Sequence, residues 1–255
     1  MDYSNLIKKR NFYTNNKSIL KSEILEKIDK NFDIDFTHES TTIEGNTLTL
    51  REAKLVIEDN ISIGGKELRE IYEVINHNNA FSYVKKCIEK SEDLSEEKVK
   101  DIHQILTEKI MQGGIYRNTD VRITGAEHTP PTPNEMYKEL LFFYDDLKVK
   151  EEQLNPIEMA AWTHAEFVKI HPFPDGNGRT SRLIMNYQLM KKGFLPVSIK
   201  PKDRLKYYEV LDNYAITGNL EDFTNLIYEL EEQRLDEINK IINQELNSNI
   251  TGQIN

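Results

Sequence analysis

Apolar residues recur at helical spacing along almost the whole chain, and this periodicity is the feature that most restricts its fold. One apolar stripe starts at Leu68 and runs to about Lys90, and another runs from Ser95 to Met111. Apolar side chains three or four residues apart lie on one face of a helix, whereas strands need strict alternation. Only 11 glycines and 8 prolines interrupt these patterns in 255 residues. The sequence therefore predicts an all-α fold.

Capping signals place the ends of several helices. Thr49–Glu52 is a capping box, in which the first and fourth side chains satisfy backbone N–H groups of the first turn. Asn155 followed by Pro156 and Glu158 is typical of a helix start, because proline is preorganised for the first helical position. Further helices are expected over residues 23–31, 133–147, 176–193, 203–217 and 220–246.

One segment breaks the helical pattern. Between Gly113 and Pro133, strand-forming residues at Val121–Gly125 are followed by turn formers at His128–Pro131. This texture predicts a short β-hairpin, which we call the flap (residues 113–132).

Charge and cysteine content exclude several classes of protein. There are 43 acidic and 33 basic residues, a net charge of -10, which argues against a dedicated nucleic-acid binder. The single cysteine, Cys87, rules out a disulfide framework and favours a cytoplasmic location. No apolar run approaches the ~18–20 residues that span a bilayer, so no membrane association is expected.

The positive charge is concentrated in one segment. Residues 169–206 hold nine basic and two acidic side chains, so that segment is positive within an acidic chain. Such an island indicates either an anionic ligand held locally or a solvated, lysine-rich helix face.

Residues His171–Arg182, inside this island, combine groups suited to phosphate chemistry. Gly176 and Gly178 let the backbone approach a ligand without hindrance from a Cβ atom. The helix expected to start near Gly176 offers free N–H groups and a positive dipole end. Arg179 and Arg182 are three residues apart, so both project from one face with donor forks that match phosphate oxygens.

The same run holds a base and a metal ligand. His171 can take a proton near neutral pH, and Asp175 offers the hard oxygen that Mg²⁺ prefers when it bridges phosphates. A base, a metal ligand, an anion site and two guanidinium groups within twelve residues indicate a nucleotidyl- or phosphoryl-transfer site.

Residues 171–182 also resemble the HPFx(D/E)GNGRxxR signature of the Fic (filamentation-induced-by-cAMP) family at every specified position. Gly114–Arg117, Val121–Gly125 and Pro130–Pro131 are similar to the flap region of that family, whose core is all-helical apart from a short β-hairpin flap. The resemblance implies a protein adenylyltransferase. Such an enzyme moves AMP from ATP to a Tyr, Thr or Ser hydroxyl of a target protein, or of the chain itself.

The resemblance assigns roles within this run. His171 would deprotonate the attacking hydroxyl, and Asp175 would hold Mg²⁺ on the α- and β-phosphates. Arg179 would contact the β-phosphate and Arg182 the γ-phosphate. The other nucleotide-binding residues around the phosphates would be Gly176, Asn177 and Gly178.

Two softer assignments follow from the same resemblance. Ile123 and Thr124 of the flap would align the target protein by backbone pairing, with Thr124 also beside the nucleotide. Tyr207 and Tyr208 are similar to a pair that lines the adenine side, although two tyrosines at helical spacing also suit a plain core.

A second motif lies upstream. Residues 40–46, Ser-Thr-Thr-Ile-Glu-Gly-Asn, resemble the inhibitory motif (S/T)xxxE(G/N) of the family, and Ser40 and Glu44 share a face one helical turn apart. The resemblance places Glu44 against Arg182, which the γ-phosphate otherwise needs, so the chain is expected to inhibit itself. It also permits a de-AMPylating activity in which Glu44 and His171 act together.

The chain is thus expected to divide into three parts: an N-terminal helical region with the inhibitory motif (1–94), a catalytic core (95–228), and a C-terminal helix and tail (229–255). The C-terminal helix is expected to pack on the core, with assembly into a homo-oligomer as the alternative. Two other functions stay open. One is phosphate transfer or another nucleotide transfer on the same scaffold, and the other is a non-catalytic nucleotide-sensing module.

Overall fold

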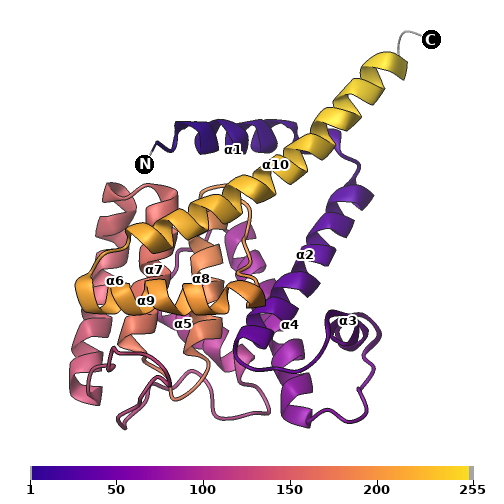
Figure 1. The fold of residues 1–255 in the computed structure, drawn as a ribbon. Coiled ribbons are helices and arrows are strands. Elements are labelled where there is room, and N and C mark those ends of the chain that lie inside the picture. Colours follow the sequence, from indigo (N-terminus) through magenta and orange to yellow (C-terminus); the bar gives the residue numbers. More distant parts are fainter. Residues whose placement is uncertain (1, 253–255) are drawn as a thin grey trace.

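The computed structural model describes residues 2–252, and this part of the chain is helical with no strand (Figure 1). Short 3₁₀ turns precede α2 and α9, at Lys17–Ile19 and Pro201–Asp203. The helices are α1 (Ser4–Asn16), α2 (Ser22–Ile43), α3 (Leu50–Asp59), α4 (Leu68–Glu89), α5 (Glu96–Leu106), α6 (Pro133–Gln153), α7 (Pro156–Ile170), α8 (Asn177–Lys191), α9 (Arg204–Thr217) and α10 (Glu221–Gly252).

Helices α7 and α8 form the centre of the fold. Helices α2, α4, α5, α6, α9 and α10 each pack against one or both of them, whereas α1 packs on α10 and α3 packs on α2 and α4 (Figure 1). Residues 179–189 of α8 are all buried, including polar side chains such as Arg182 and Asn186. A helix buried on every face must satisfy its polar groups within the protein. Asn186 does so by exchanging two hydrogen bonds with the backbone of Val197, at 2.8 and 2.9 Å.

The predicted capping signals are confirmed. Thr49 and Glu52 form a reciprocal capping box at the start of α3, and Asn155 and Glu158 form another at the start of α7. The expected helix 95–111 is shorter than predicted, because α5 ends at Leu106. The α1 helix was not expected, since its apolar pattern is weak.

The predicted hairpin is wrong. Within the described residues, 112–132 form turns and loop, although Ala126 N–H does bond to Ile123 O at 3.3 Å. A hairpin needs N–H groups that pair across two strands. The amides of Glu127 and His128 instead donate to the Asp212 carboxylate of α9, at 2.8 and 2.9 Å. The prolines at 130, 131 and 133 have no N–H to offer.

The first helix packs against the last (Figure 1). Lys9 of α1 forms ion pairs with Glu232 and Asp236 of α10, at 2.9 and 2.8 Å. Helix α10 buries Phe223, Leu235 and Ile242 in the core, so the expectation that it packs there is confirmed. The end of the expected tail, residues 253–255, lies outside the described residues. Among the helices that the structure describes, none is both long and apolar enough to cross a bilayer.

Candidate active site

The loop between α7 and α8 carries the site, and its geometry follows from its sequence. His171 ends α7 in the left-handed conformation (φ 51°, ψ 59°), and Gly176 starts α8 in the same region (φ 79°). Asn177, the first residue of α8, closes the loop. Its side-chain oxygen accepts from Phe173 N–H at 2.9 Å, and its amide donates to Phe173 O at 2.8 Å. The Asn177 side chain therefore stabilises the loop through its own hydrogen bonds, and only the Asn177 backbone N–H remains available to a ligand.

The His171 imidazole is a candidate base. Its Nδ1 lies 3.4 Å from Val168 O, a contact that favours the proton on Nδ1 and leaves the Nε2 lone pair free. Burial lowers the pKa of His171 to about 4, with a further lowering by the charge of Arg117. The ring is therefore neutral at physiological pH and able to accept a proton.

The first turn of α8 is an anion site. No side chain caps this turn, so its leading N–H groups lack intrahelical partners. A Cβ atom added at Gly178 would lie 2.3 Å from Glu44 Oε1 and 3.2 Å from an Arg182 nitrogen. A carboxylate thus already lies against this backbone, as expected where a helix terminus favours negative charge.

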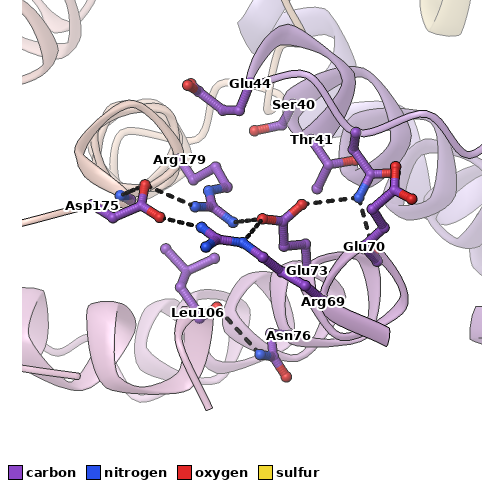
Figure 2. A network of polar contacts seen from close by, with 12 residues as sticks. Ser40, Thr41, Glu44, Arg69, Glu70, Glu73, Asn76, Leu106, Asp175 and Arg179 are labelled. Carbon is purple, nitrogen blue, oxygen red and sulfur yellow. Dashed lines mark hydrogen bonds and ion pairs between the residues drawn. The ribbon is translucent and has the colours of Figure 1, made fainter. Parts of the chain in front are cut away.

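Asp175 lies in a closed ring of charges with Arg179 and two residues of α4 (Figure 2). Its carboxylate pairs with Arg69, and through the other oxygen with Arg179 at 3.3 Å. Both arginines also reach Glu73, at 3.2 Å from Arg69 and 3.4 Å from Arg179. We call this the charge ring (Arg69, Glu73, Asp175 and Arg179). Its two carboxylates and two guanidinium groups balance.

The charge ring is tied to the end of the motif at residues 40–46. Asn46 donates to the second oxygen of Glu73 at 3.0 Å and to Glu70 O at 2.9 Å. Arg179 is buried, with 3% of its side chain exposed, yet its Nε and Nη1 atoms have no hydrogen-bond partner within the described residues. The ring therefore joins α4, the residues after α2, and the start of α8.

Asp175 is suited to a divalent cation. Burial raises its pKa, but the charges of Arg179 and Arg69 and the Gly176 N–H outweigh that effect, so the pKa lies below its ordinary value. The carboxylate is therefore ionised and 41% exposed. No group of three or more potential metal ligands occurs in residues 2–252, so Mg²⁺ would depend on substrate phosphates, as is usual for this ion.

Arg182 is fully enclosed and held by α2. Its guanidinium donates to Glu44 Oε1 at 2.7 Å and to the hydroxyl and carbonyl oxygens of Ser40, both at 2.9 Å. A fourth bond, at 3.2 Å, reaches the Tyr207 hydroxyl. Arg182 is 1% exposed whereas Glu44 is 32% exposed, so the carboxylate faces solvent on one side. Ser40, Glu44 and Arg182 therefore meet as the sequence motifs predict.

Both tyrosines of the softer assignment contact this centre. Tyr208 is partly exposed, and its hydroxyl donates to Ile43 O, within the inhibitory motif, at 3.3 Å. Tyr207 is buried and bonds to Arg182 and to His164, which is itself fully buried and also contacts Ser181. His164 is thus a core residue.

In the flap, Thr124 is exposed and Ile123 half-buried, and within the described residues neither hydrogen-bonds to the first turn of α8.

The sequence did not indicate the site residues that other elements supply. Arg69 and Glu73 are spaced four apart on α4, a pattern common on solvated helices, so nothing local singled them out. His103 stacks on Phe173 and bonds to Asp175 O at 2.9 Å.

Comparisons with known proteins agree with this geometry. The family model described as Fic/DOC family matches residues 93–189. A curated relative named protein adenylyltransferase Fic, from Nematostella vectensis, is 39% identical over 203 residues, which is 78% of this chain and 47% of the relative. One of the same name from Aedes aegypti is 33% identical over 216 residues, 83% of this chain and 43% of the relative. The chain spans less than half the length of these relatives.

Solved structures match nearly the whole chain. A Fic domain containing signaling protein from Bacteroides thetaiotaomicron is 25% identical with a TM-score of 0.81, and the match covers 92% of this chain and 97% of that one. Fic-1 from C. elegans is 27% identical with a TM-score of 0.79, covering 91% of this chain and 70% of that one. The signature loop, the helical fold around it and these relatives agree, and residues 93–189 of the chain form a domain of the Fic/DOC family.

Proposed function

We propose that the chain is a protein adenylyltransferase that moves AMP from ATP to a Tyr, Thr or Ser hydroxyl of a target protein, or of the chain itself. The observation that carries this proposal is a neutral imidazole beside an uncapped helix N-terminus flanked by two buried arginines. The names of the curated relatives support the same activity. The buried free thiol of Cys87 supports work in a reducing compartment such as the cytoplasm.

His171 performs the proton transfer in this mechanism. Its Nε2 accepts the proton of the target hydroxyl while that oxygen forms a bond to the α-phosphorus of ATP. The bond between the α-phosphorus and the bridging oxygen breaks, and pyrophosphate leaves. Because the imidazole is unprotonated at neutral pH, it serves as the base without a prior deprotonation step.

The start of α8 holds the phosphates. The backbone around Gly176, Asn177 and Gly178 presents N–H groups to phosphate oxygens, with Arg179 at the β-phosphate and Arg182 at the γ-phosphate. Asp175 would hold Mg²⁺, and the bound ion would supply positive charge to stabilise the phosphates. Arg179 keeps its guanidinium beside Asp175, so both groups are positioned before the nucleotide arrives.

Glu44 is the proposed inhibitor. Its carboxylate occupies the space against Gly178 and pairs with Arg182, so it competes with phosphate for the same guanidinium and the same backbone. Ser40 holds Arg182 from two sides and so keeps the arginine directed at Glu44. ATP then binds productively only when the Glu44–Arg182 pair opens.

The target is proposed to dock at the flap, with Ile123 and Thr124 pairing to its backbone. The flap is loop in the described residues, so this pairing would order it on binding. Tyr208, beside the inhibitory motif, is proposed to line the adenine side. Removal of AMP from a modified target is a second candidate activity, in which Glu44 and His171 act together. It is favoured by the negative charge of Glu44, which raises the pKa of His171.

The proposed transfer is tested with the Glu44→Gly variant and ATP labelled at either the α- or the γ-phosphate. We expect α-label on protein from Glu44→Gly, much less from wild type, and none from the Glu44→Gly, His171→Ala double variant. Label from the γ-phosphate alone would identify a phosphotransferase. No label from either position, with unchanged nucleotide binding by His171→Ala, would identify a sensor. Incubating the labelled product with wild-type chain tests removal of AMP.

A further inference from the structure

The backbone of His171 is held in a conformation that a residue with a Cβ atom rarely adopts. Its φ of 51° lies in the left-handed region, where glycine usually ends a helix. Such strain persists only where the surroundings fix it. The side chain direction of the candidate base depends on these two backbone angles, so whatever fixes them also aims the imidazole.

A buried arginine contacts this backbone directly. Arg117 Nε donates to His171 O at 2.8 Å, and Nη2 reaches Ile170 O at 3.5 Å. The remaining donors bond to Thr119 O at 2.9 Å and Pro131 O at 2.5 Å. Arg117 is 1% exposed, and each hydrogen bond that its guanidinium donates within the described residues goes to a backbone carbonyl. One guanidinium therefore joins the end of α7 to both sides of the flap.

A cation is favoured at this position because it lies at a helix C-terminus. The carbonyls of Ile170 and His171 belong to the last turn of α7 and its cap, where intrahelical donors run out. A guanidinium there interacts favourably with the negative end of the helix dipole. The main chain of Arg117 adds a bond from its N–H to Pro172 O at 2.9 Å. Arg117 thus hydrogen-bonds to three successive carbonyl oxygens, those of Ile170, His171 and Pro172.

We propose that Arg117 is a positioning residue for His171: its guanidinium caps α7 and fixes the left-handed backbone that aims the imidazole at the phosphate-binding end of α8. This inference rests on the proposed function of His171 as the base. Lysine cannot take the place of Arg117, because one ammonium group does not span carbonyls on three segments in a planar fork.

The charge of Arg117 has a second effect on His171. Burial and the charge of Arg117 lower the pKa of the imidazole, whereas the hydrogen bond to Val168 O and the charges of Glu44 and Asp175 raise it. Removal of the Arg117 charge therefore favours the imidazolium, which is no base. Arg117→Lys retains a positive charge but loses the planar fork, whereas Arg117→Gln loses the charge. Comparing the two variants separates the effect on the position of the imidazole from the effect on its protonation.

The kinetic test compares Arg117→Lys with its parent in the Glu44→Gly background. We expect kcat for AMP transfer to fall on the order of 100-fold, because small misplacements of a catalytic group have effects of this size. KM for ATP is expected to stay unchanged, since the Arg117 side chain bonds to the end of α7 and the flap and not to the first turn of α8. Arg234→Lys is the matched control. Arg234 is a half-buried arginine of α10, and its guanidinium carbon lies 3.6 Å from the centre of the Phe32 ring. An equal loss of kcat in this control, or none in Arg117→Lys, would overturn the proposal.

An independent readout uses the chain without any turnover. Histidine-labelled protein, titrated by NMR, reports the protonation of His171 directly. We expect the His171 pKa to rise in Arg117→Gln and to stay low in Arg117→Lys, with an altered ring chemical shift in both. Unchanged His171 signals in both variants would refute the positioning role. If Glu44→Gly transfers no AMP at all, the proposed function fails, and the NMR titration still decides the role of Arg117.

Discussion

Replacing Gly178 by alanine tests whether Glu44 really lies against the first turn of α8. The backbone of Gly178 is helical, so alanine itself is tolerated there. The added Cβ would lie 2.3 Å from Glu44 Oε1, whereas ordinary contacts begin at 3.4 Å. The carboxylate must therefore retreat by about 1 Å, which breaks its 2.7 Å bond to Arg182. The effect of Gly178→Ala should thus depend on whether Glu44 is present.

The magnitude follows from two opposing contributions. A hydrogen bond to a charged group contributes about 1.5–3 kcal/mol, and the 32% exposure of Glu44 reduces this to about 1–2 kcal/mol. Against this, glycine-to-alanine replacement at a compatible helical site stabilises by about 0.4–1 kcal/mol. We therefore expect Gly178→Ala to lower the free energy of unfolding by about 0.5–1 kcal/mol in wild type. The same change should raise it by about 0.5–1 kcal/mol in Glu44→Gly.

Urea denaturation of the four chains of this double-mutant cycle measures the coupling, expected at about 1–2 kcal/mol. Gly64→Ala is the control, because a Cβ at Gly64 meets nothing within 4 Å and its effect should be equal in both backgrounds. An equal effect of Gly178→Ala with and without Glu44 would refute the contact between Glu44 and the phosphate-binding turn.

Four further predictions concern ligand binding, catalysis and the pH dependence of stability. In a thermal-shift assay, Mg-ATP at about 100 times its Kd should raise the Tm of Glu44→Gly by about 5–10 °C, and wild type should need more ATP for the same shift. Arg69→Met removes an exposed ion-pair partner of Asp175, so the affinity for Mn²⁺ measured by titration calorimetry should increase about two- to fivefold. An unchanged affinity would show that Arg69 does not compete with the metal for Asp175. The rate of AMP transfer by Glu44→Gly should hold down to about pH 5, because the His171 pKa of about 4 lies below its ordinary value, and an acid limb near pH 6.5 would contradict this. The low pKa also means that this residue contributes a loss of stability as pH falls through the range from about 6.5 to 4. Burial raises the pKa of Glu231 far above its ordinary value, so wild type loses stability as pH rises from about 4.5. Glu231→Gln should therefore be the more stable chain at pH 7, with the difference vanishing near pH 4, as measured by chemical denaturation.

What the sequence predicted correctly depends on contacts close along the chain. The caps at Thr49 and Asn155 join residues three apart, and the site groups from His171 to Arg182 lie on one loop and one helical turn. Local geometry alone brings such groups together. The Glu44–Arg182 pair, 138 positions apart, was predicted only through resemblance to a family.

What the sequence did not predict depends on how distant elements pack. The charge ring needs α4 to lie beside the start of α8, and no local pattern in Arg69 or Glu73 shows that contact. The hairpin prediction failed because Asp212, far along the chain, takes the N–H groups that a second strand would need. Strand propensity is easily overridden by such partners.

The backbone hydrogen bonds of the turn after α2 do not depend on the Glu44 side chain. Glu44 N–H and Asn46 N–H both bond to Thr41 O, at 3.0 and 3.2 Å, and Gly45 N–H bonds to Thr42 O at 3.0 Å. None of these bonds uses the Glu44 carboxylate, so the scaffold survives its removal. If Glu44 is the inhibitor that we propose, a single codon change at this position removes or restores the inhibition while these backbone bonds stay in place.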